Sequence, residues 1–229
     1  MNVMTGAKRD KGTRTAGMDP GSPCISFLAP QDVRPLARLY TEVFLADEPT
    51  SVRIAPDPAR LLPHAEWYIG SLVPRGFSLA ARDPGSGEPV GFLFSFDVTD
   101  EFSESPGRYA AYLENFHEAV LMIDALEQRF LERGGIPPGS VLHTLQAGVR
   151  ANFRQRGVLA AMMEQLVSRA RERGYRQIVA ECTNPVSHTA FLNLGFRPAG
   201  FLPYDTFLIH GRPYFAGLEG GLFLVVRDL

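Results

Sequence analysis

The sequence predicts a single α/β domain in which helices flank a mixed β-sheet. Apolar residues alternate or run together in segments of strand length, recur at helical spacing in longer segments, and are separated by turn residues. At 229 residues and 45% hydrophobic content, the chain can bury a sizeable core. No low-complexity linker or internal repeat divides residues 24–229, so we expect them to form one domain.

Each predicted element rests on its own local pattern. Asp32 is a possible cap of the first helix, and Gly134 with Gly135 ends the longest one. In chain order the expected elements are a strand (25–28), two helices (33–44 and 61–72), a hairpin (76–82 and 90–98), a long helix (109–130), a strand (141–149), a helix (from 157), a strand (177–180), a short helix (from 185) and a last strand (222–227).

A strand, a basic turn and a helix form a candidate anion-binding element. Residues 141–149 alternate as a half-buried strand does, and a helical apolar stripe begins after Gly157. The first turn of a helix has unpaired N–H groups and partial positive charge, which suit a pyrophosphate, and glycine lets a ligand approach the backbone. Arg154 and Arg156 add charge. An ordinary turn glycine with solvated arginines explains the same pattern, so this element alone leaves both interpretations open.

A second helix start lies at Asn184. Asparagine is a favoured N-cap, Pro185 fits the first helical position, and Gly195 supplies a left-handed stop. The right-handed crossover from strand 141–149 to strand 177–180 makes these strands parallel neighbours. The two helix starts would then lie close together.

These two segments resemble the acyl-CoA site of the GNAT acetyltransferase superfamily. Residues 154–159 match its pyrophosphate motif except at Leu159, where a small residue is usual, and residues 184–196 match its asparagine and Leu-Gly-Phe signature. The resemblance implies a largely antiparallel central sheet with one parallel, splayed strand pair, and acetyl-CoA as co-substrate. The cofactor-binding residues it implies are Ala147, Gly148, Val149, Arg154, Gln155, Arg156, Gly157, Val158, Leu159, Ala160, Asn184 and Ser187.

A narrower resemblance concerns the catalytic residues. Residues 44–49 are similar to the Asp-Glu-Pro segment of insect arylalkylamine N-acetyltransferases, whose glutamate is the general base and corresponds to Glu48. Two assisting serines of that group fall on Thr183 and Ser187. His143 lies where vertebrate serotonin-acetylating relatives have the first of two strand histidines. The tyrosine that often serves the superfamily as general acid is Phe191 here.

Each catalytic candidate also has a structural explanation. Glu48 could be a solvated loop carboxylate, although Pro49 keeps it extended. His143 lies on an apolar strand, where a core histidine bonded to backbone is as reasonable as a base. Ser187 could support its helix start through a local bond.

Composition and spacing limit the partners. A net charge of −2 predicts no nucleic-acid partner, and no segment approaches the roughly 20 apolar residues that span a bilayer, so we expect no membrane partner and a cytoplasmic location. Residues 1–23 are polar and predicted to be a disordered leader. Neither the cysteines nor the histidines show ligand spacing, so no metal is predicted. A monomer and a homodimer both remain open.

The predicted function is direct transfer of an acetyl group from acetyl-CoA to a primary amine of a small molecule, of the arylalkylamine or polyamine type. Glu48 would remove the ammonium proton, and a backbone N–H near Val149 would hold the oxyanion. Two alternatives are a non-catalytic acyl-CoA-binding regulatory module, which Phe191 and Leu159 permit, and a protein or peptide N-acetyltransferase. Turnover of any amine excludes the first, and a closed aromatic pocket argues against the second.

Overall fold

The computed structural model describes residues 22–131 and 135–229. The predicted leader falls almost entirely outside these residues, as does Gly134. The helices and strands are β1 (Cys24–Phe27), η1 (Pro30–Asp32), α1 (Val33–Asp47), α2 (Pro49–Ile54), α3 (Pro58–Leu72), η2 (Val73–Arg75), β2 (Leu79–Arg82), β3 (Pro89–Asp97), α4 (Pro106–Leu113), η3 (Glu114–Phe116), α5 (His117–Phe130), β4 (Val141–Val149), η5 (Ala151–Phe153), α6 (Val158–Glu172), β5 (Gln177–Cys182), α7 (Pro185–Asn193), β6 (Arg197–Pro203) and β7 (Gly221–Asp228).

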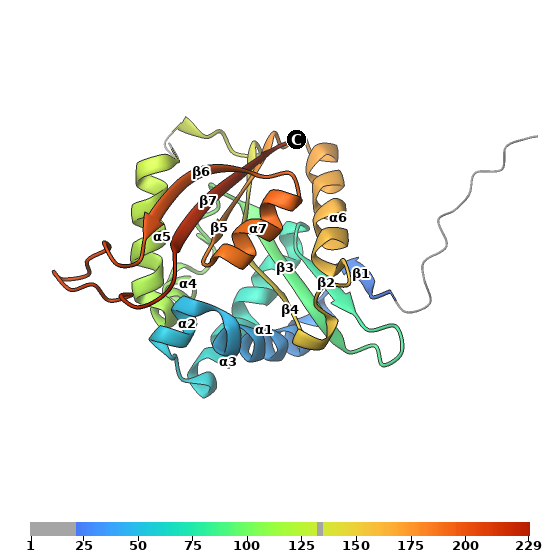
Figure 1. Ribbon diagram of the computed structural model, residues 1–229. Coiled ribbons are helices and arrows are strands. Elements are labelled where there is room, and N and C mark those ends of the chain that lie inside the picture. Colours follow the sequence, from blue (N-terminus) through green and yellow to red (C-terminus); the bar gives the residue numbers. More distant parts are fainter. Residues whose placement is uncertain (1–21, 132–134) are drawn as a thin grey trace, which may run out of the picture.

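Within the described residues, the strands form one seven-stranded sheet in the order β1-β2-β3-β4-β5-β7-β6 (Figure 1). Strands β2 and β3 form the predicted hairpin. Neighbouring strands are antiparallel except β4 and β5, which are parallel and joined by the α6 crossover. The predicted fold class, a largely antiparallel sheet with one parallel pair between helices, is confirmed.

The parallel pair separates toward its carboxyl ends. Strands β4 and β5 are paired from Val141 and Gln177 to Thr144 and Ala180, and no further. Beyond that point β4 stays paired with β3, and β5 stays paired with β7. A register shift leaves Leu145 as a bulge in β4 at the place where the strands part. The sheet therefore has an opening bounded by two strands that are each fixed on their far side.

Helices cover both faces of the sheet (Figure 1). Helices α1, α3, α4 and α5 enclose an aromatic core on one face, which takes Phe92 and Phe94 from β3. Helices α6 and α7 cover the other face, which takes Leu93 from β3 and Leu142 from β4. This division follows from the alternation of side chains along a strand.

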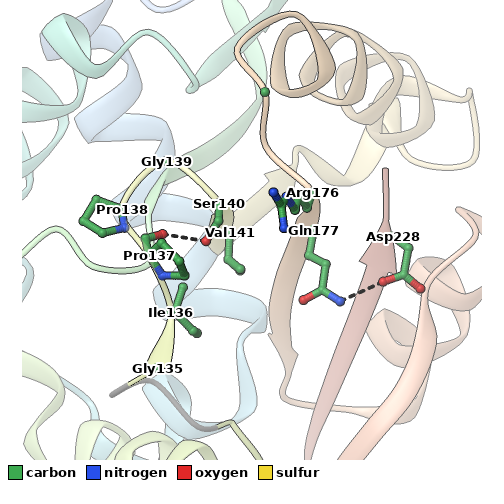
Figure 2. Close-up of a pocket in the computed structure, with 11 residues that line it drawn as sticks. Gly135, Ile136, Pro137, Pro138, Gly139, Ser140, Val141, Arg176, Gln177 and Asp228 are labelled. Carbon is green, nitrogen blue, oxygen red and sulfur yellow. Dashed lines mark hydrogen bonds between the residues drawn. The ribbon is translucent and has the colours of Figure 1, made fainter.

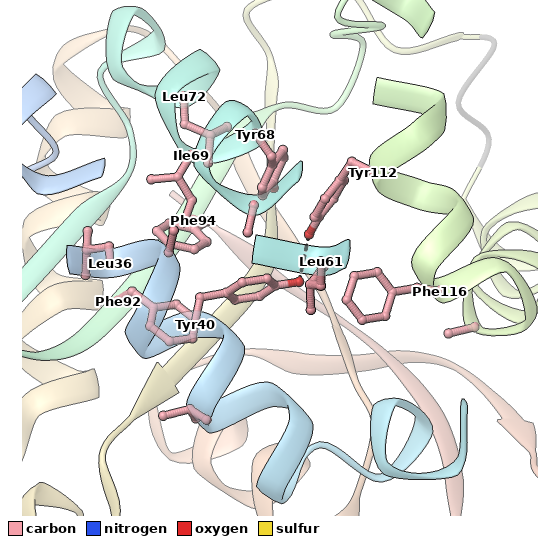
Figure 3. Packing of buried hydrophobic residues seen from close by; sticks show 14 of the residues in the cluster. Leu36, Tyr40, Leu61, Tyr68, Ile69, Leu72, Phe92, Phe94, Tyr112 and Phe116 are labelled. Atoms are coloured by element: carbon pink, nitrogen blue, oxygen red, sulfur yellow. Dashed lines mark hydrogen bonds between the residues drawn. The ribbon is translucent and has the colours of Figure 1, made fainter. Parts of the chain in front are cut away.

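The aromatic core contains a buried hydrogen-bonded chain of hydroxyl and amide groups, and Figure 3 shows its three tyrosines, Tyr40, Tyr68 and Tyr112. The hydroxyls of Tyr40 and Tyr112 lie 2.8 Å apart, the Gln146 amide donates to Tyr112 at 3.0 Å, and Tyr68 donates to Gln146 at 2.7 Å. The Tyr68 and Tyr112 rings stack at 4.3 Å. Every polar group in this chain has a partner, so the helices are tied to β4 just after its bulge at little desolvation cost.

The predicted long helix over residues 109–130 is wrong, because two helices, α4 and α5, are separated by the turn η3. The side-chain amide of Asn115 donates to the carbonyls of Ala111 and Tyr112, which end α4. It also bonds to His64 of α3 at 2.9 Å. An asparagine amide that donates to backbone carbonyls competes with the hydrogen bonds of the helix. Apolar periodicity in the sequence cannot reveal this competition.

Three further features differ from the sequence prediction. Asp32 precedes α1 but makes no capping bond to it; its carboxylate accepts the Ala29 N–H at 2.8 Å and pairs with Arg82 of β2. The short helix α2 and the edge strand β6 were not predicted. In the described part of the chain, no helix is both long and apolar enough to cross a membrane.

Candidate active site

The turn that leads into α6 is exposed over residues 154–157, whereas Val158, the first helical residue, is buried. Gly157 precedes the helix with φ of 75°, and Gln155 also has a left-handed φ of 60°. A Cβ placed on Gly157 would meet no atom within 4 Å. As Gly157 has no side chain to cap the helix, the N–H groups of the first turn face this space, which fits the predicted pyrophosphate site.

The two arginines of this turn differ in their contacts. Arg154 donates to the Val149 carbonyl at 2.9 Å and forms an ion pair with Asp47 at the end of α1. Arg156 is exposed and lies 5.2 Å from the Phe153 ring centroid. The charge of Arg156 is therefore available to an anion, whereas Arg154 ties the turn to α1.

The first turn of α6 also places Leu159, whose size departs from the family motif. Its partly buried side chain packs against the core between α6 and the sheet. The larger side chain is therefore accommodated by hydrophobic packing.

The start of α7 is capped as predicted. The Asn184 side chain accepts the Ser187 N–H at 2.7 Å, and Pro185 is the first helical residue. The Ser187 hydroxyl donates to the Asn184 carbonyl at 3.0 Å and accepts the Asn184 N–H at 3.4 Å. Gly195 ends the segment with φ of 84°. The local-support role of Ser187 is thus observed.

Glu48 lies between α1 and α2 with extended backbone, as its place before Pro49 predicts. Its carboxylate caps α2: Oε1 accepts the Thr50 N–H at 3.0 Å, and Oε2 accepts the Ser51 N–H at 2.6 Å and the Thr50 hydroxyl at 2.7 Å. The side chain is half-buried. Glu48 is therefore an oriented carboxylate and not a freely solvated one.

Tyr204 connects the region of Glu48 with that of Thr183. Its buried hydroxyl donates to the Thr183 carbonyl at 2.7 Å. Burial, together with the charge of Glu48, holds the pKa of Tyr204 well above its ordinary value. Burial likewise raises the pKa of Tyr40, with a further contribution from Glu48. The Glu48 carboxylate thus lies near both phenols, on the same face of the sheet as the aromatic core.

His143 belongs to a closed cluster that the sequence did not predict. Its Nε2 lies 2.6 Å from a carboxylate oxygen of Glu181 on β5 and 4.0 Å from one of Glu127 on α5. The side chains of the histidine and both glutamates are only 4% and 2% exposed. Glu127, His143 and Glu181 are far apart in the sequence, so no short motif indicates that they form a cluster. An acidic residue within an otherwise apolar strand, as Glu181 is in β5, is the signal that could have identified it.

Phe191 of α7 and Cys182 at the end of β5 are both buried. Phe191, which replaces the usual general acid, is buried and packs edge-on against Phe196 at 5.0 Å. Burial and the charge of Glu181 raise the pKa of the Cys182 thiol to about 12. This thiol therefore stays protonated at neutral pH and is a poor nucleophile.

A surface pocket of about 560 Å³ lies at the other end of the parallel pair (Figure 2). Residues 135–141 line one side, and Arg176, Gln177 and Asp228 line the other. These residues are at the amino ends of β4 and β5, opposite the opening. None of the predicted site residues lines this pocket.

Fold and site together define an acetyltransferase of the GNAT type. The model of the Acetyltransferase (GNAT) family matches residues 41–196, so the chain belongs to that family. A search of curated proteins found no significant match.

Solved structures share the fold at low sequence identity. A polyamine N-acetyltransferase from Drosophila melanogaster is 19% identical with a TM-score of 0.72, covering 90% of this chain and 100% of its own. Arylalkylamine N-acetyltransferase 2 from Aedes aegypti is 16% identical with a TM-score of 0.74, covering 90% and 98%. A phosphinothricin acetyltransferase from Sinorhizobium meliloti, in complex with AcCoA, is 15% identical with a TM-score of 0.58, covering 91% and 89%.

Proposed function

We propose that this protein transfers an acetyl group from acetyl-CoA to the primary amine of a small molecule, of the arylalkylamine or polyamine type. The observation that carries the proposal is the opening between β4 and β5 beyond Thr144 and Ala180, next to the exposed turn that precedes α6. A pantetheine arm would pair with the main chain of residues 147–149 by strand addition. The N–H groups that follow Gly157 would take the pyrophosphate.

Direct transfer needs a neutral amine, and an alkylammonium group has a pKa of about 10, so a proton must be removed. We assign this step to Glu48. A carboxylate has about four lone-pair positions, of which the contacts with Thr50 and Ser51 use three, and the fourth lies on Oε1. That position would accept the proton directly or through a water molecule.

The remaining steps use groups at the mouth of the opening. The amine nitrogen bonds to the thioester carbonyl carbon while a backbone N–H near Val149 stabilises the oxyanion. The C–S bond then breaks, the extra proton on the nitrogen passes through water to the leaving thiolate sulfur, and the hydroxyl of Ser187 or Thr183 stabilises that sulfur with a hydrogen bond. His143 has no part in this scheme, because its cluster is closed to an amine.

Two observations support a small amine as acceptor. Structural neighbours carry the names of polyamine and arylalkylamine N-acetyltransferases, although their identity to this chain is below 20%. The half-buried Glu48 follows the partly buried Phe44 by one helical turn at the edge of the aromatic core, which places apolar side chains beside a carboxylate.

A thiol-release assay with acetyl-CoA and a panel of amines tests the proposal. The panel contains a phenylethylamine, an alkyl diamine and a short peptide with a free amino group. In Glu48→Gln we expect turnover to fall roughly 10²-fold near neutral pH, the usual contribution of a general base. Higher pH should restore part of the rate, because more of the amine is then already neutral.

Two control variants separate basicity from structure. Glu164→Gln makes the same change on the exposed face of α6, and Thr50→Val removes a hydrogen-bond partner of Glu48 but leaves the carboxylate. Both should keep most of the activity. Full activity of Glu48→Gln at every pH would remove Glu48 from the mechanism, and absence of turnover with every amine would overturn the proposed function.

A further inference from the structure

Three metal-ligand side chains converge in the interior, away from the proposed path of acetyl transfer. Glu127 comes from α5, His143 from β4 and Glu181 from β5. Each offers one ligand atom, and the three atoms lie within 4.8 Å of one another. The residues are on the side of the sheet that faces α5, at the point where β4 and β5 separate.

We propose that Glu127, His143 and Glu181 bind one divalent transition-metal ion, of the zinc class. In a tetrahedral site with bonds of about 2.1 Å, ligand atoms are roughly 3.4 Å apart. The His143 nitrogen is now 2.6 Å from Glu181 and 4.0 Å from Glu127. Side-chain adjustments of about 1 Å would bring the three atoms to bonding positions around an ion.

The donor set selects the kind of ion. One imidazole nitrogen and two carboxylate oxygens suit Zn²⁺, Mn²⁺ or Fe²⁺, whereas Mg²⁺ and Ca²⁺ prefer oxygen ligands alone. A divalent ion also matches the formal charge of two carboxylates beside a neutral imidazole. In the dry interior this match matters more than at the surface, because a buried charge must be balanced there.

Burial distinguishes a metal ion from a substrate at this cluster. The three side chains are 2% to 4% exposed, so an amine would have to displace protein to reach them. A metal ion would lie between the ligand atoms themselves. It would link α5 to both strands that border the opening, and it would hold His143 as a ligand and not as a base.

This inference departs from the sequence-based prediction of no metal, which considered local spacing of cysteines and histidines. Here the ligands are 16 and 38 residues apart and meet only through the fold. The proposal does not depend on acetyl transfer, since its readout is metal binding.

The test uses the full chain, stripped of metal with a chelator and then dialysed. Calorimetric titration with Zn²⁺ should give one site per chain, and Mg²⁺ should give none. Co²⁺ should produce visible absorption bands that added Zn²⁺ removes. Thermal stability of the wild type should rise with Zn²⁺ concentration, because a ligand of the folded state stabilises it.

Variants locate the site. His143→Gln, Glu127→Gln and Glu181→Gln should each weaken Zn²⁺ binding by about 100-fold, at least the effect of losing an outer-shell partner. His117→Gln, which removes an exposed histidine of α5, is the matched control and should bind as the wild type does. The proposal fails if the stripped wild type shows no stoichiometric site, or if His143→Gln and His117→Gln bind equally. If one ligand variant does not fold, the other two locate the site, and a wild type without a stoichiometric site overturns the proposal whatever the variants do.

Discussion

Replacement of Gly157 by glutamate tests whether the start of α6 holds the pyrophosphate of acetyl-CoA. Two properties of this position decide what a side chain does there: its backbone conformation and the space around it. Its φ of 75° is a left-handed conformation, which costs an ordinary L-residue roughly 1–2 kcal/mol. Its surroundings are open, because no atom lies within 4 Å of a Cβ placed there. A side chain therefore strains the backbone but meets no steric clash.

The electrostatic effect of the glutamate is larger than this strain. One unit of like charge at about 5 Å from the pyrophosphate, with an effective dielectric constant of about 20, costs about 3 kcal/mol. That corresponds to roughly 100-fold weaker binding. Gly157→Asn is the matched control, because asparagine tolerates the left-handed conformation and carries no charge. We expect Gly157→Asn to lose far less affinity.

Calorimetry with coenzyme A at two salt concentrations measures the electrostatic effect, and thermal unfolding measures the backbone strain. In about 1 M salt the Debye length falls to about 3 Å, so the difference between the glutamate and asparagine variants should shrink while the strain remains. Circular dichroism and thermal unfolding confirm that both variants fold. Equal affinity of the two variants at low salt would show that the phosphates bind elsewhere.

Three further predictions concern residues around the site. Gly148→Ala should destabilise the protein by about 1–3 kcal/mol in urea unfolding, because the new methyl overlaps the Phe92 ring, and Phe92→Leu in the same chain should recover part of the loss. Above pH 9 stability should fall by up to about 1.4 kcal/mol per pH unit on account of Cys182, since its pKa of about 12 in the folded state lets the unfolded chain lose the proton first. Cys182→Ala should show a shallower fall between pH 9 and 11, and an identical slope would contradict the assignment. Asp97→Asn should lower the unfolding midpoint but leave turnover per folded molecule unchanged, because this carboxylate accepts bonds from Gly139 and Tyr175 and serves a structural role.

The sequence predicted best where a few adjacent residues decide the conformation. Asn184 and Pro185 set the start of α7 by local hydrogen bonding and a fixed φ, and Gly157 supplies the left-handed residue before α6. The splayed strand pair followed from the crossover rule and the family resemblance. Such features need no knowledge of distant contacts, and they are the ones that define the cofactor side of the site.

Distant side-chain contacts account for what the sequence did not show. Asn115 ends α4 through its own amide and reaches His64 in another helix. Arg154 looked like a phosphate ligand, yet its guanidinium is held by Asp47, 107 residues earlier. Glutamate is not among the favoured N-cap residues, so Pro49 at the first helical position was the one usual signal for the start of α2. For Asn115 and Arg154 the decisive partner is set by tertiary packing.

The solvent exposure of a side chain decides which ligand can reach it, so two glutamates that look alike in the sequence can have different roles. The turn around Gly157 is exposed and can meet a large anionic ligand from solvent. Glu48 is half-buried and keeps one lone-pair position, so it can meet an amine that enters beside the aromatic core. Glu181 carries the same carboxyl group but is enclosed with His143, where an amine cannot reach it. A general base must be reached by its substrate, whereas a metal ligand needs only the ion, and burial therefore separates the two glutamates where residue type cannot.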